Sequence, residues 1–321
     1  PLHGPTFSGN EWSFVKECLD STYVSSIGQF VDRFEADLVR YTGARHAVAM
    51  VNGTAALHIS LLLAGVEDDD EVLVPALTFV ATANAVTYCN ATPHFVDSDE
   101  ATLGISSQAL RSYLERKTKR GKGCCVNKST GKIIRALLPM HTFGHPSQLD
   151  ELLQIADDFQ LTLIEDAAES LGSFYRGRHT GTFGRLGVLS FNGNKIITTG
   201  GGGAILTNDT ALAHRAKHLT TTAKKPHIWN YDHDEIGYNY RMSNVLAGIG
   251  RGQLQVLNER VGLRRHVFAT YQRLLADVPE IEWMPEASYG TTNRWLTACT
   301  LSGPLRPADL IKALAREEIE A

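Results

Sequence analysis

A regular alternation of short apolar runs and helical patterns extends to residue 208 and restricts the fold more than any other feature of the sequence. The spacing predicts strands at 46–51, 71–75, 94–97, 133–140, 161–166, 188–191 and 204–206. Helical patterns separate most of them, at 30–41, 53–64, 78–82, 110–114, 149–159 and 211–219. Strands separated by helices, with short loops between them, indicate an α/β fold in which helices cover both faces of a mostly parallel sheet.

The pattern changes after residue 208. The remaining chain predicts a polar and aromatic loop, a largely helical stretch, alternating strands and one more helix, at 220–240, 243–274, 281–300 and 307–318. We expect a large domain, residues 1–257, and a partial, smaller α+β domain, residues 258–321. Residues 1–30 are polar and rich in Gly and Ser, and no helix or strand is assigned to them. The chain begins at Pro1 rather than at Met, so we expect that residues are missing from that end.

Composition and charge argue against several classes of protein. The net charge is −4, and the basic run RKTKRGK at 116–122 is interpreted as a solvated helix end and loop rather than a nucleic-acid patch. No apolar run approaches the ~20 residues that a membrane span needs, and the N-terminus lacks a signal-peptide pattern. The five cysteines are scattered, without a CxxC pair, which argues against a disulfide framework. We expect a cytoplasmic protein that binds neither nucleic acid nor membrane.

Several chemically useful residues follow the predicted strands. Asn52–Ala55, Phe79, Asp166 and Ser190–Lys195 all lie at strand ends. In sheets of this kind ligands bind beyond the carboxyl ends of the strands, so we expect these residues to share one site. Asn52–Ala55 also opens a buried helix, whose free N–H groups and positive dipole end suit a phosphate.

Lys195 lies between an apolar run and the four glycines Gly200–Gly203, where a rigid scaffold can hold it. A lysine becomes a nucleophile when it is partly desolvated or set beside other cations. A lysine that forms a Schiff base, a carboxylate such as Asp166 that pairs with a pyridinium nitrogen, and a phosphate cradle together are what pyridoxal phosphate (PLP) requires. The combination predicts PLP chemistry.

Each residue also has a simpler interpretation. Lys195 alone could be a surface lysine, and Asp166 alone could cap the next helix. His141 and His145 have the i, i+4 spacing of a metal pair, but a glycine and a proline beside them indicate a loop, and no third ligand is clustered with them. We therefore expect no metal.

Six segments, in one order along the chain, carry a family resemblance that covers nearly the whole sequence. They are NGTAALH (52–58), DEVLVPALTFVATANAV (70–86), EDAAESLGS (165–173), GTFG (181–184), SFNGNKIITTGGGGAILTND (190–209) and EIGYNYRMSN (235–244). They resemble the DegT/DnrJ/EryC1/StrS family of sugar aminotransferases, which are fold-type-I PLP enzymes. The opening PLHGPTFSGNEW and the form SFNGNKIITTGGGG further resemble the branch that acts on legionaminic acid and bacillosamine precursors. The resemblance implies a mostly parallel seven-stranded sheet and a smaller C-terminal α+β domain, here without the family's last strands and helix.

The same resemblance implies a role for each site residue. Lys195 would bond to the cofactor aldehyde and then shuttle a proton, Asp166 would pair with the pyridinium, and Phe79 would stack on the ring. Glu169 stands where many relatives have glutamine, near the phenolic oxygen of the cofactor, and Asn239 would reach the phosphate of the other subunit's cofactor. The implied cofactor-binding residues are Gly53, Thr54, Ala55, Phe79, Asp166, Glu169, Ser190, Asn192, Lys195 and Asn239. The implied substrate contacts are Tyr23, Ser26 and Arg241.

The implied reaction moves an amino group from L-glutamate to C4 of a nucleotide-linked 4-keto-6-deoxy-(N-acetylamino)hexose, in a homodimer with shared active sites. Alternatives are amination at C3 and a cofactor-binding scaffold without turnover. A sugar dehydratase on the same scaffold is a further alternative, but those relatives carry histidine in place of Lys195. A regulatory module that uses the glycines as a phosphate loop fails the GxxxxGK[ST] spacing, because Lys195 precedes them.

The segment AGIGRGQL (247–254) departs from the family, whose relatives usually have an alanine-rich helix there. Each glycine in a helix interior costs roughly 1 kcal/mol against alanine. The sequence alone gives no physical reason for these glycines.

Overall fold

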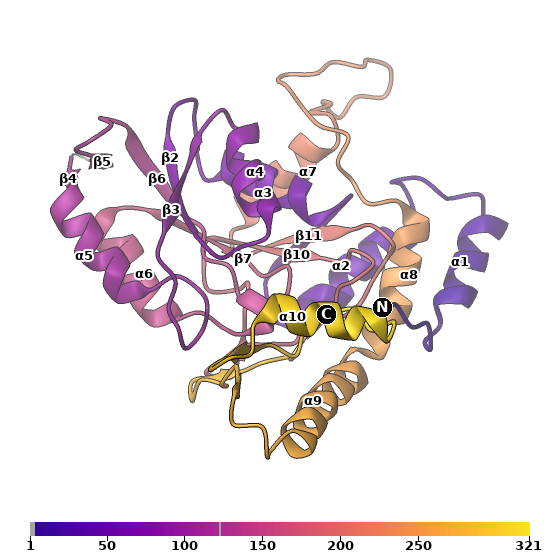
Figure 1. The fold of residues 1–321 in the computed structure, drawn as a ribbon. Helices are drawn as coiled ribbons and strands as arrows, with labels where there is room; N and C mark the ends of the chain where they lie inside the picture. The colour runs from indigo at the N-terminus through magenta and orange to yellow at the C-terminus, as the bar shows by residue number, and fades with distance from the viewer. Residues whose placement is uncertain (1–3, 122) are drawn as a thin grey trace.

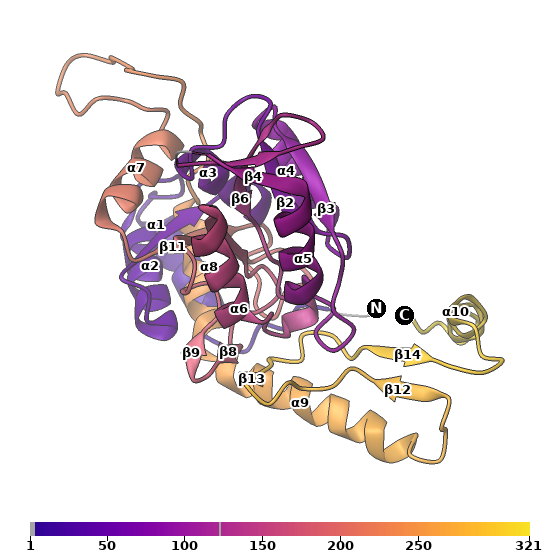
Figure 2. The ribbon, with the colours of Figure 1, turned by 90° about the vertical axis from the view of Figure 1, so that its left-hand side faces the viewer.

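The computed structural model describes residues 4–121 and 123–321. Pro1–His3, which open the PLHGPTFSGNEW segment, and Lys122, the last residue of the basic run, lie outside the described residues. A central sheet is wrapped by helices, and a smaller lobe that begins with α9 (Leu257–Leu274) extends from one end of it (Figures 1 and 2). The boundary at residue 257 stays a prediction.

The central sheet has the strand order β1-β11-β10-β7-β6-β2-β3, which confirms the expected mostly parallel sheet. The strands from β10 to β3 pair in parallel, whereas β11 is antiparallel to both of its neighbours. A short hairpin, β4–β5, which the sequence analysis did not assign, pairs with β6. The bounds are β1 His46–Met50, β2 Glu71–Pro75, β3 Thr92–Val96, β4 Thr118–Arg120, β5 Cys125–Asn127, β6 Ile133–Leu137, β7 Thr162–Asp166, β10 Leu186–Ser190 and β11 Gly203–Thr207.

The reversal at β11 explains where Lys195 lies. β10 and β11 are joined by a loop, 191–202, without a crossover helix, so the second strand must return antiparallel to the first. Lys195 lies inside this loop rather than at the strand end that the sequence suggests. Its N–H donates to the Asn192 carbonyl at 3.0 Å, and Asn192 in turn bridges to Gly200, so the loop is held to itself.

Helices cover both faces of the sheet, because successive apolar side chains of each strand point to opposite faces and both faces must be buried. Ile164 and Ile205 pack with α3, α4 and α7 on one face. Leu189 and Ala204 pack with α2 and α8 on the other, and Leu163 continues that second face under α5 and α6. The bounds are α2 Gln29–Thr42, α3 Gly53–Leu63, α4 Val80–Tyr88, α5 Ser107–Lys117, α6 Leu149–Phe159, α7 Thr210–Thr220 and α8 Asn244–Gln255.

The N-terminal stretch contains a helix, α1 (Glu11–Asp20), that the sequence analysis did not assign. Only Glu11 and Cys18 of this helix are buried, so its apolar pattern is weak. It packs along α8, which is far away in the sequence. The apolar residues of α1 do not by themselves indicate this contact.

The glycines of α8 account for this packing. A Cβ on Gly252 would lie 2.6 Å from the Glu11 backbone nitrogen, and one on Gly250 would lie 2.7 Å from the Phe34 ring. Alanine at either position would push α1 or α2 away from α8. These glycines lower the helix propensity of α8, but their missing side chains let α1 and α2 approach it closely.

The smaller lobe begins with α9 and continues with three short strands and a last helix (Figure 2). β12 pairs with β14, while β13 pairs with β8 of the large unit, which is also paired with β9. This second pairing ties the lobe to the body that carries the site. The bounds are β8 Phe174–Tyr175, β9 Arg178–His179, β12 Ile281–Trp283, β13 Gly290–Thr291, β14 Cys299–Leu301 and α10 Pro307–Arg316. Among the described residues, no helix has the length and apolar character needed to cross a bilayer.

Candidate active site

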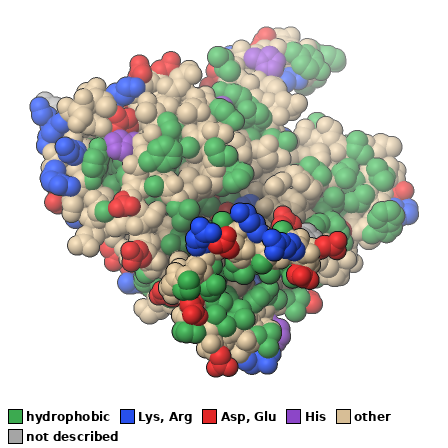
Figure 3. Space-filling model, in the orientation of Figure 1, with side chains coloured by type: hydrophobic (Ala, Val, Ile, Leu, Met, Phe, Trp, Pro, Cys, Tyr) green, Lys and Arg blue, Asp and Glu red, His purple; other side chains and the backbone are tan. Residues whose placement is uncertain are grey.

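A cavity of about 270 Å³ lies where β7 and β10 end and α3 begins. Seen from the side of Figure 1, the surface is hollowed above α10 (Figure 3). The cavity brings together eight of the residues predicted from sequence: Gly53, Thr54, Phe79, Asp166, Glu169, Ser190, Asn192 and Lys195. The other lining residues are Asn52, Leu57, Ala81, Met140, Ala168, Asn194 and Trp295.

Asp166 ends β7 as a buried carboxylate. Its Oδ2 accepts a hydrogen bond from Thr82 Oγ1 at 2.8 Å, and its Oδ1 accepts one from the Ala168 N–H at 3.1 Å. Burial raises the pKa of Asp166, and the bonds from Thr82 and Ala168 and the charge of Lys195 offset only part of that effect. The site therefore favours a cation against this carboxylate.

Lys195 reaches the same cavity from the β10–β11 loop. Its side chain is 11% exposed, and its Nζ lies 3.3 Å from Glu169 Oε1. On another side, Nζ lies 4.1 Å from the centre of the Trp295 ring. Glu169 is itself held by the Phe143 N–H, which donates to Oε2 at 2.8 Å, and burial raises the pKa of Glu169. The lysine is thus confined between a carboxylate and an aromatic face.

The start of α3 offers the anion site that the sequence predicts. Asn52 caps the helix by accepting the Ala55 N–H at 2.7 Å, so that amide is already used within the helix start. The amides of Gly53 and Thr54 belong to the first turn, whose N–H groups have no partner within a helix. A Cβ on Gly53 would lie 3.0 Å from the Ser190 Cβ and 3.2 Å from its Oγ, so glycine keeps the space between the helix start and Ser190 open.

These features fit PLP. The helix start and the Ser190 hydroxyl provide donors for a phosphate, and the buried Asp166 provides an anion for a protonated ring nitrogen. Lys195 provides the amine for the aldehyde carbon. Phe79, which is 64% exposed, stands at the edge of the cavity where a ring could be covered.

The neighbouring Glu165 does not line the cavity, and its carboxylate binds His141 and the loop at 181–184. It lies 3.0 Å from His141 Nε2 and accepts the N–H groups of Gly181, Phe183 and Gly184 at 2.7, 2.6 and 2.7 Å. Burial by itself would raise the pKa of Glu165, but the bonds from His141 and these amides outweigh it and lower the pKa.

Four residues from the predicted set, besides Ala55, are not among those that line the cavity within the described chain. Asn239 is exposed between Tyr238 and Tyr240, whose rings stack on each other and meet the buried ring of His58 edge-on. Arg241 forms an ion pair with Glu35 at 2.9 Å and donates to the Ala49 carbonyl. The remaining two, Tyr23 and Ser26, lie in the segment between α1 and α2, and Tyr23 is 58% exposed.

Two residues that position the predicted side chains, Thr82 and Trp295, were not predicted from the sequence. The sequence predicts Thr82 only as part of the helical pattern at 78–82, yet its hydroxyl donates a hydrogen bond to Asp166. Its position in the first turn of α4, within the segment that opens with Thr78, is the signal that could have suggested it. Trp295 comes from the smaller lobe, and no local pattern marks it.

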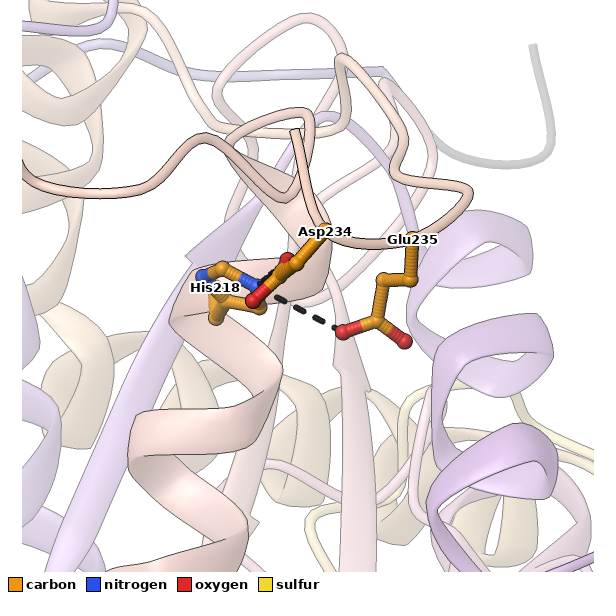
Figure 4. Close-up of side chains that lie close together, drawn as sticks. All are labelled: His218, Asp234 and Glu235. Carbon is orange, nitrogen blue, oxygen red and sulfur yellow. Dashed lines mark hydrogen bonds and ion pairs between the residues drawn. The ribbon is translucent and has the colours of Figure 1, made fainter. Parts of the chain in front are cut away.

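A cluster of titratable side chains also lies outside the site. His218 Nε2 lies 2.7 Å from Asp234 Oδ1 and 3.4 Å from Glu235 Oε1 (Figure 4). Arg215 donates to both carboxylate oxygens of Glu235. With these oxygens paired to side chains of α7, the cluster anchors the long loop between α7 and α8 to its helix.

Comparison with known proteins places this site in a family. The sequence model of the DegT/DnrJ/EryC1/StrS aminotransferase family matches residues 6–321 of this chain. The chain is 42% identical over 320 residues to the putative pyridoxal phosphate-dependent aminotransferase EpsN of Bacillus subtilis (strain 168), covering 100% of this chain and 80% of that protein. It is 38% identical over 281 residues to GDP-perosamine synthase of Escherichia coli O157:H7, covering 88% and 72% of the two chains.

Solved structures agree with this placement. The aminotransferase TlmJ from Streptoalloteichus hindustanus superposes with a TM-score of 0.89 at 28% identity, covering 100% of this chain and 83% of that one. DesV from S. venezuelae, solved in complex with a ketimine intermediate, superposes with a TM-score of 0.85 at 29% identity, covering 97% and 78%. The chain therefore belongs to the DegT/DnrJ/EryC1/StrS family and is a PLP-dependent sugar aminotransferase.

Proposed function

We propose that this enzyme transfers an amino group from L-glutamate to C4 of a nucleotide-linked 4-keto-6-deoxy-(N-acetylamino)hexose, in the cytoplasm. The observation that carries the proposal is the meeting of Lys195, Asp166 and the open start of α3 in one cavity. Similar relatives that are named GDP-perosamine synthase support a nucleotide sugar as acceptor. The branch that acts on legionaminic acid and bacillosamine precursors remains a prediction from the sequence.

In this proposal the protein divides the chemistry between few groups. When bound, PLP supplies an aldehyde carbon and an electron-accepting ring. Asp166 keeps a proton on the ring nitrogen, because its buried carboxylate is stabilised by that positive charge. Lys195 Nζ, once free, moves a proton to or from the carbon that carries the amino group. Glu169, next to Lys195, orients that amine.

The start of α3 and Ser190 would hold the phosphate of PLP, and Lys195 lies in the same cavity. Fixed placement of reacting groups removes the entropic cost of bringing them together. Met140 and Leu57 line the same cavity and add apolar surface beside these groups.

We also propose that the active protein is a homodimer in which Asn239 contacts the cofactor phosphate of the partner subunit. In this chain Asn239 is exposed, and the stacked pair Tyr238 and Tyr240 presses against His58 on α3. The ring contacts of its two neighbours thus hold the segment against α3, and Asn239 itself stays exposed. The exposed apolar residues Ile228, Trp229 and Tyr231 on the same loop offer surface for a second copy.

The test is incubation of the protein with glutamate, PLP and a panel of 4-keto and 3-keto nucleotide sugars, followed by mass spectrometry. We expect an amino sugar from a 4-keto substrate and 2-oxoglutarate from glutamate, with no product from Lys195→Ala. Lys217→Ala, which removes a half-exposed lysine paired with Glu35, is the matched control and should keep turnover. Product only from 3-keto sugars would contradict the C4 assignment, and turnover by Lys195→Ala would contradict the role of the lysine.

A further inference from the structure

A four-residue segment of the smaller lobe, Thr292–Trp295, inserts into the large unit beside the site. Thr292 Oγ1 donates to the Gly144 carbonyl at 2.9 Å. The Asn293 amide donates to the carbonyls of Glu169 and Leu171, at 2.9 Å each. All four residues of the segment are buried. The segment thus fixes the backbone that carries Glu169.

The last residue of this segment also fixes the loop that carries Lys195. Trp295 Nε1 donates to the Asn194 carbonyl at 2.7 Å, and the Trp295 N–H donates to Asn293 Oδ1 at 2.9 Å. The indole is 5% exposed, and its ring centre lies 4.1 Å from Lys195 Nζ. An ammonium over the face of an indole is attracted by the ring, most strongly where water is excluded.

We propose that Trp295 is a positioning residue that, with Glu169, forms a seat for the Lys195 ammonium whenever the lysine is not bonded to the cofactor. The inference rests on the role of Lys195 in the proposed function. It assigns to the smaller lobe a direct part in the reaction, because the ring and the hydrogen bond to Asn194 both come from that lobe.

The seat has a use because the lysine must be released and recovered in each half of a transamination. A free lysine side chain has four rotatable bonds and would otherwise sample many positions. Glu169 at 3.3 Å and the ring at 4.1 Å approach Nζ from two directions and leave few alternatives. The lysine then stays beside the carbon to which it must return.

The first experiment measures the seat in the cofactor-free protein. The protein is treated with limiting acetic anhydride, and the acetylation rate of Lys195 is measured by peptide mass spectrometry relative to Lys217. W295F keeps a ring face and loses the bond to Asn194, whereas W295L and W295M lose both. W283L is the control, because Trp283 lies in the same lobe but packs against Phe268 and Tyr271.

We expect the relative acetylation rate of Lys195 to rise about fivefold to tenfold in W295L and W295M, and to stay within about twofold of the wild type in W295F. W283L should leave it unchanged. An unchanged rate in a folded W295L or W295M protein would overturn the proposal, as would an equal rise in W283L.

The second measurement needs no substitution at Trp295. In the cofactor-free wild-type protein with ¹³C-labelled lysine, the ε-methylene signal of Lys195, assigned with Lys195→Arg, should lie upfield of the exposed lysines because of the ring current. A signal at the position of a free lysine would refute the seat. With the active enzyme, W295L should lower kcat while the KM for glutamate changes little. Failure of every keto sugar to react with the wild type would contradict the proposed function, yet the two cofactor-free measurements would still decide the seat.

Discussion

Two carboxylates that are adjacent in sequence, Glu165 and Asp166, end the same strand and are treated in opposite ways by the fold. Glu165 faces away from the cavity and is matched by His141 and three backbone amides, and its pKa is lowered. Asp166 faces the cavity with two hydrogen bonds, and burial raises its pKa. Because successive residues of a strand point to opposite faces, one β7 end supplies both a structural anchor and a functional charge.

Glu165 finds its hydrogen-bonding partners within the protein, whereas Asp166 is left with room for a ligand. A buried charge is stable when its partners lie within the chain, as for Glu165. When they do not, the group is poised for a cation that comes from outside. Asp166 is in the second state, and a protonated ring nitrogen is the cation that PLP would bring.

Glu165→Gln should have the largest effect, and it should fall on stability. We expect the free energy of unfolding to drop by about 3–5 kcal/mol, because His141 loses its buried partner and an amide NH₂ meets backbone donors. Denaturant titration measures the drop. Turnover per folded molecule should change little. A loss of turnover without a loss of stability would contradict the structural role of Glu165.

Asp166→Asn should have the opposite effect: turnover should fall, and the stability of the cofactor-free protein should not. We expect turnover to fall about 10²–10³-fold, the size typical of a lost electrostatic contact in an active site. The cofactor-free protein should be at least as stable as the wild type, because the neutral side chain no longer pays for burial of a charge. Steady-state kinetics and thermal unfolding of the same preparation test both halves. A destabilised cofactor-free protein with normal kinetics would contradict the assignment.

The pH dependence of stability should separate the two groups by sign. The pKa of Glu165 is lowered in the fold, so its contribution is present above its ordinary value of 4.5 and is lost as the pH falls through the lowered value. The pKa of Asp166 is raised, so the cofactor-free wild type should lose stability relative to Asp166→Asn as the pH rises above 3.8. Urea titrations from pH 3 to 8 on both variants would show curves that diverge in opposite directions, and parallel curves would refute the contrast.

Thr82→Val should have the smallest effect. The variant removes the hydroxyl that donates to Asp166 at 2.8 Å, a bond to a charged group worth about 1.5–3 kcal/mol. We expect PLP to bind up to about tenfold more weakly, as measured by absorbance titration, because Asp166 is then harder to ionise for the ring nitrogen. Thr87→Val on the same helix is the control, since its hydroxyl only bonds to the Asn84 carbonyl. Equal affinities for the two variants would show that Thr82 does not support Asp166.

The order of strands and helices could be predicted from sequence because it depends on local periodicity. The helix of residues 149–159 was predicted with the observed bounds, since Leu149, Leu152 and Phe159 mark one buried face. α1 could not be predicted, because it packs against the glycines of α8 and shows only two buried residues of its own.

The site shows the same division. Asp166 and the Gly53–Thr54 helix start follow strands, Lys195 lies in the loop after β10, and all carry recognisable chemistry, so they could be predicted. Trp295 could not, because it reaches Lys195 only through the insertion of a distant segment. Long-range contacts of this kind leave no periodic mark in the chain.

Borohydride reduction tests whether Lys195 bonds to PLP while Asp166 faces the ring nitrogen. The protein is loaded with PLP, reduced, digested and mapped by mass spectrometry. The account predicts one phosphopyridoxyl group per chain, on Lys195, and a marked loss of it in Asp166→Asn at limiting PLP. A label on another lysine, or none on Lys195, would contradict it.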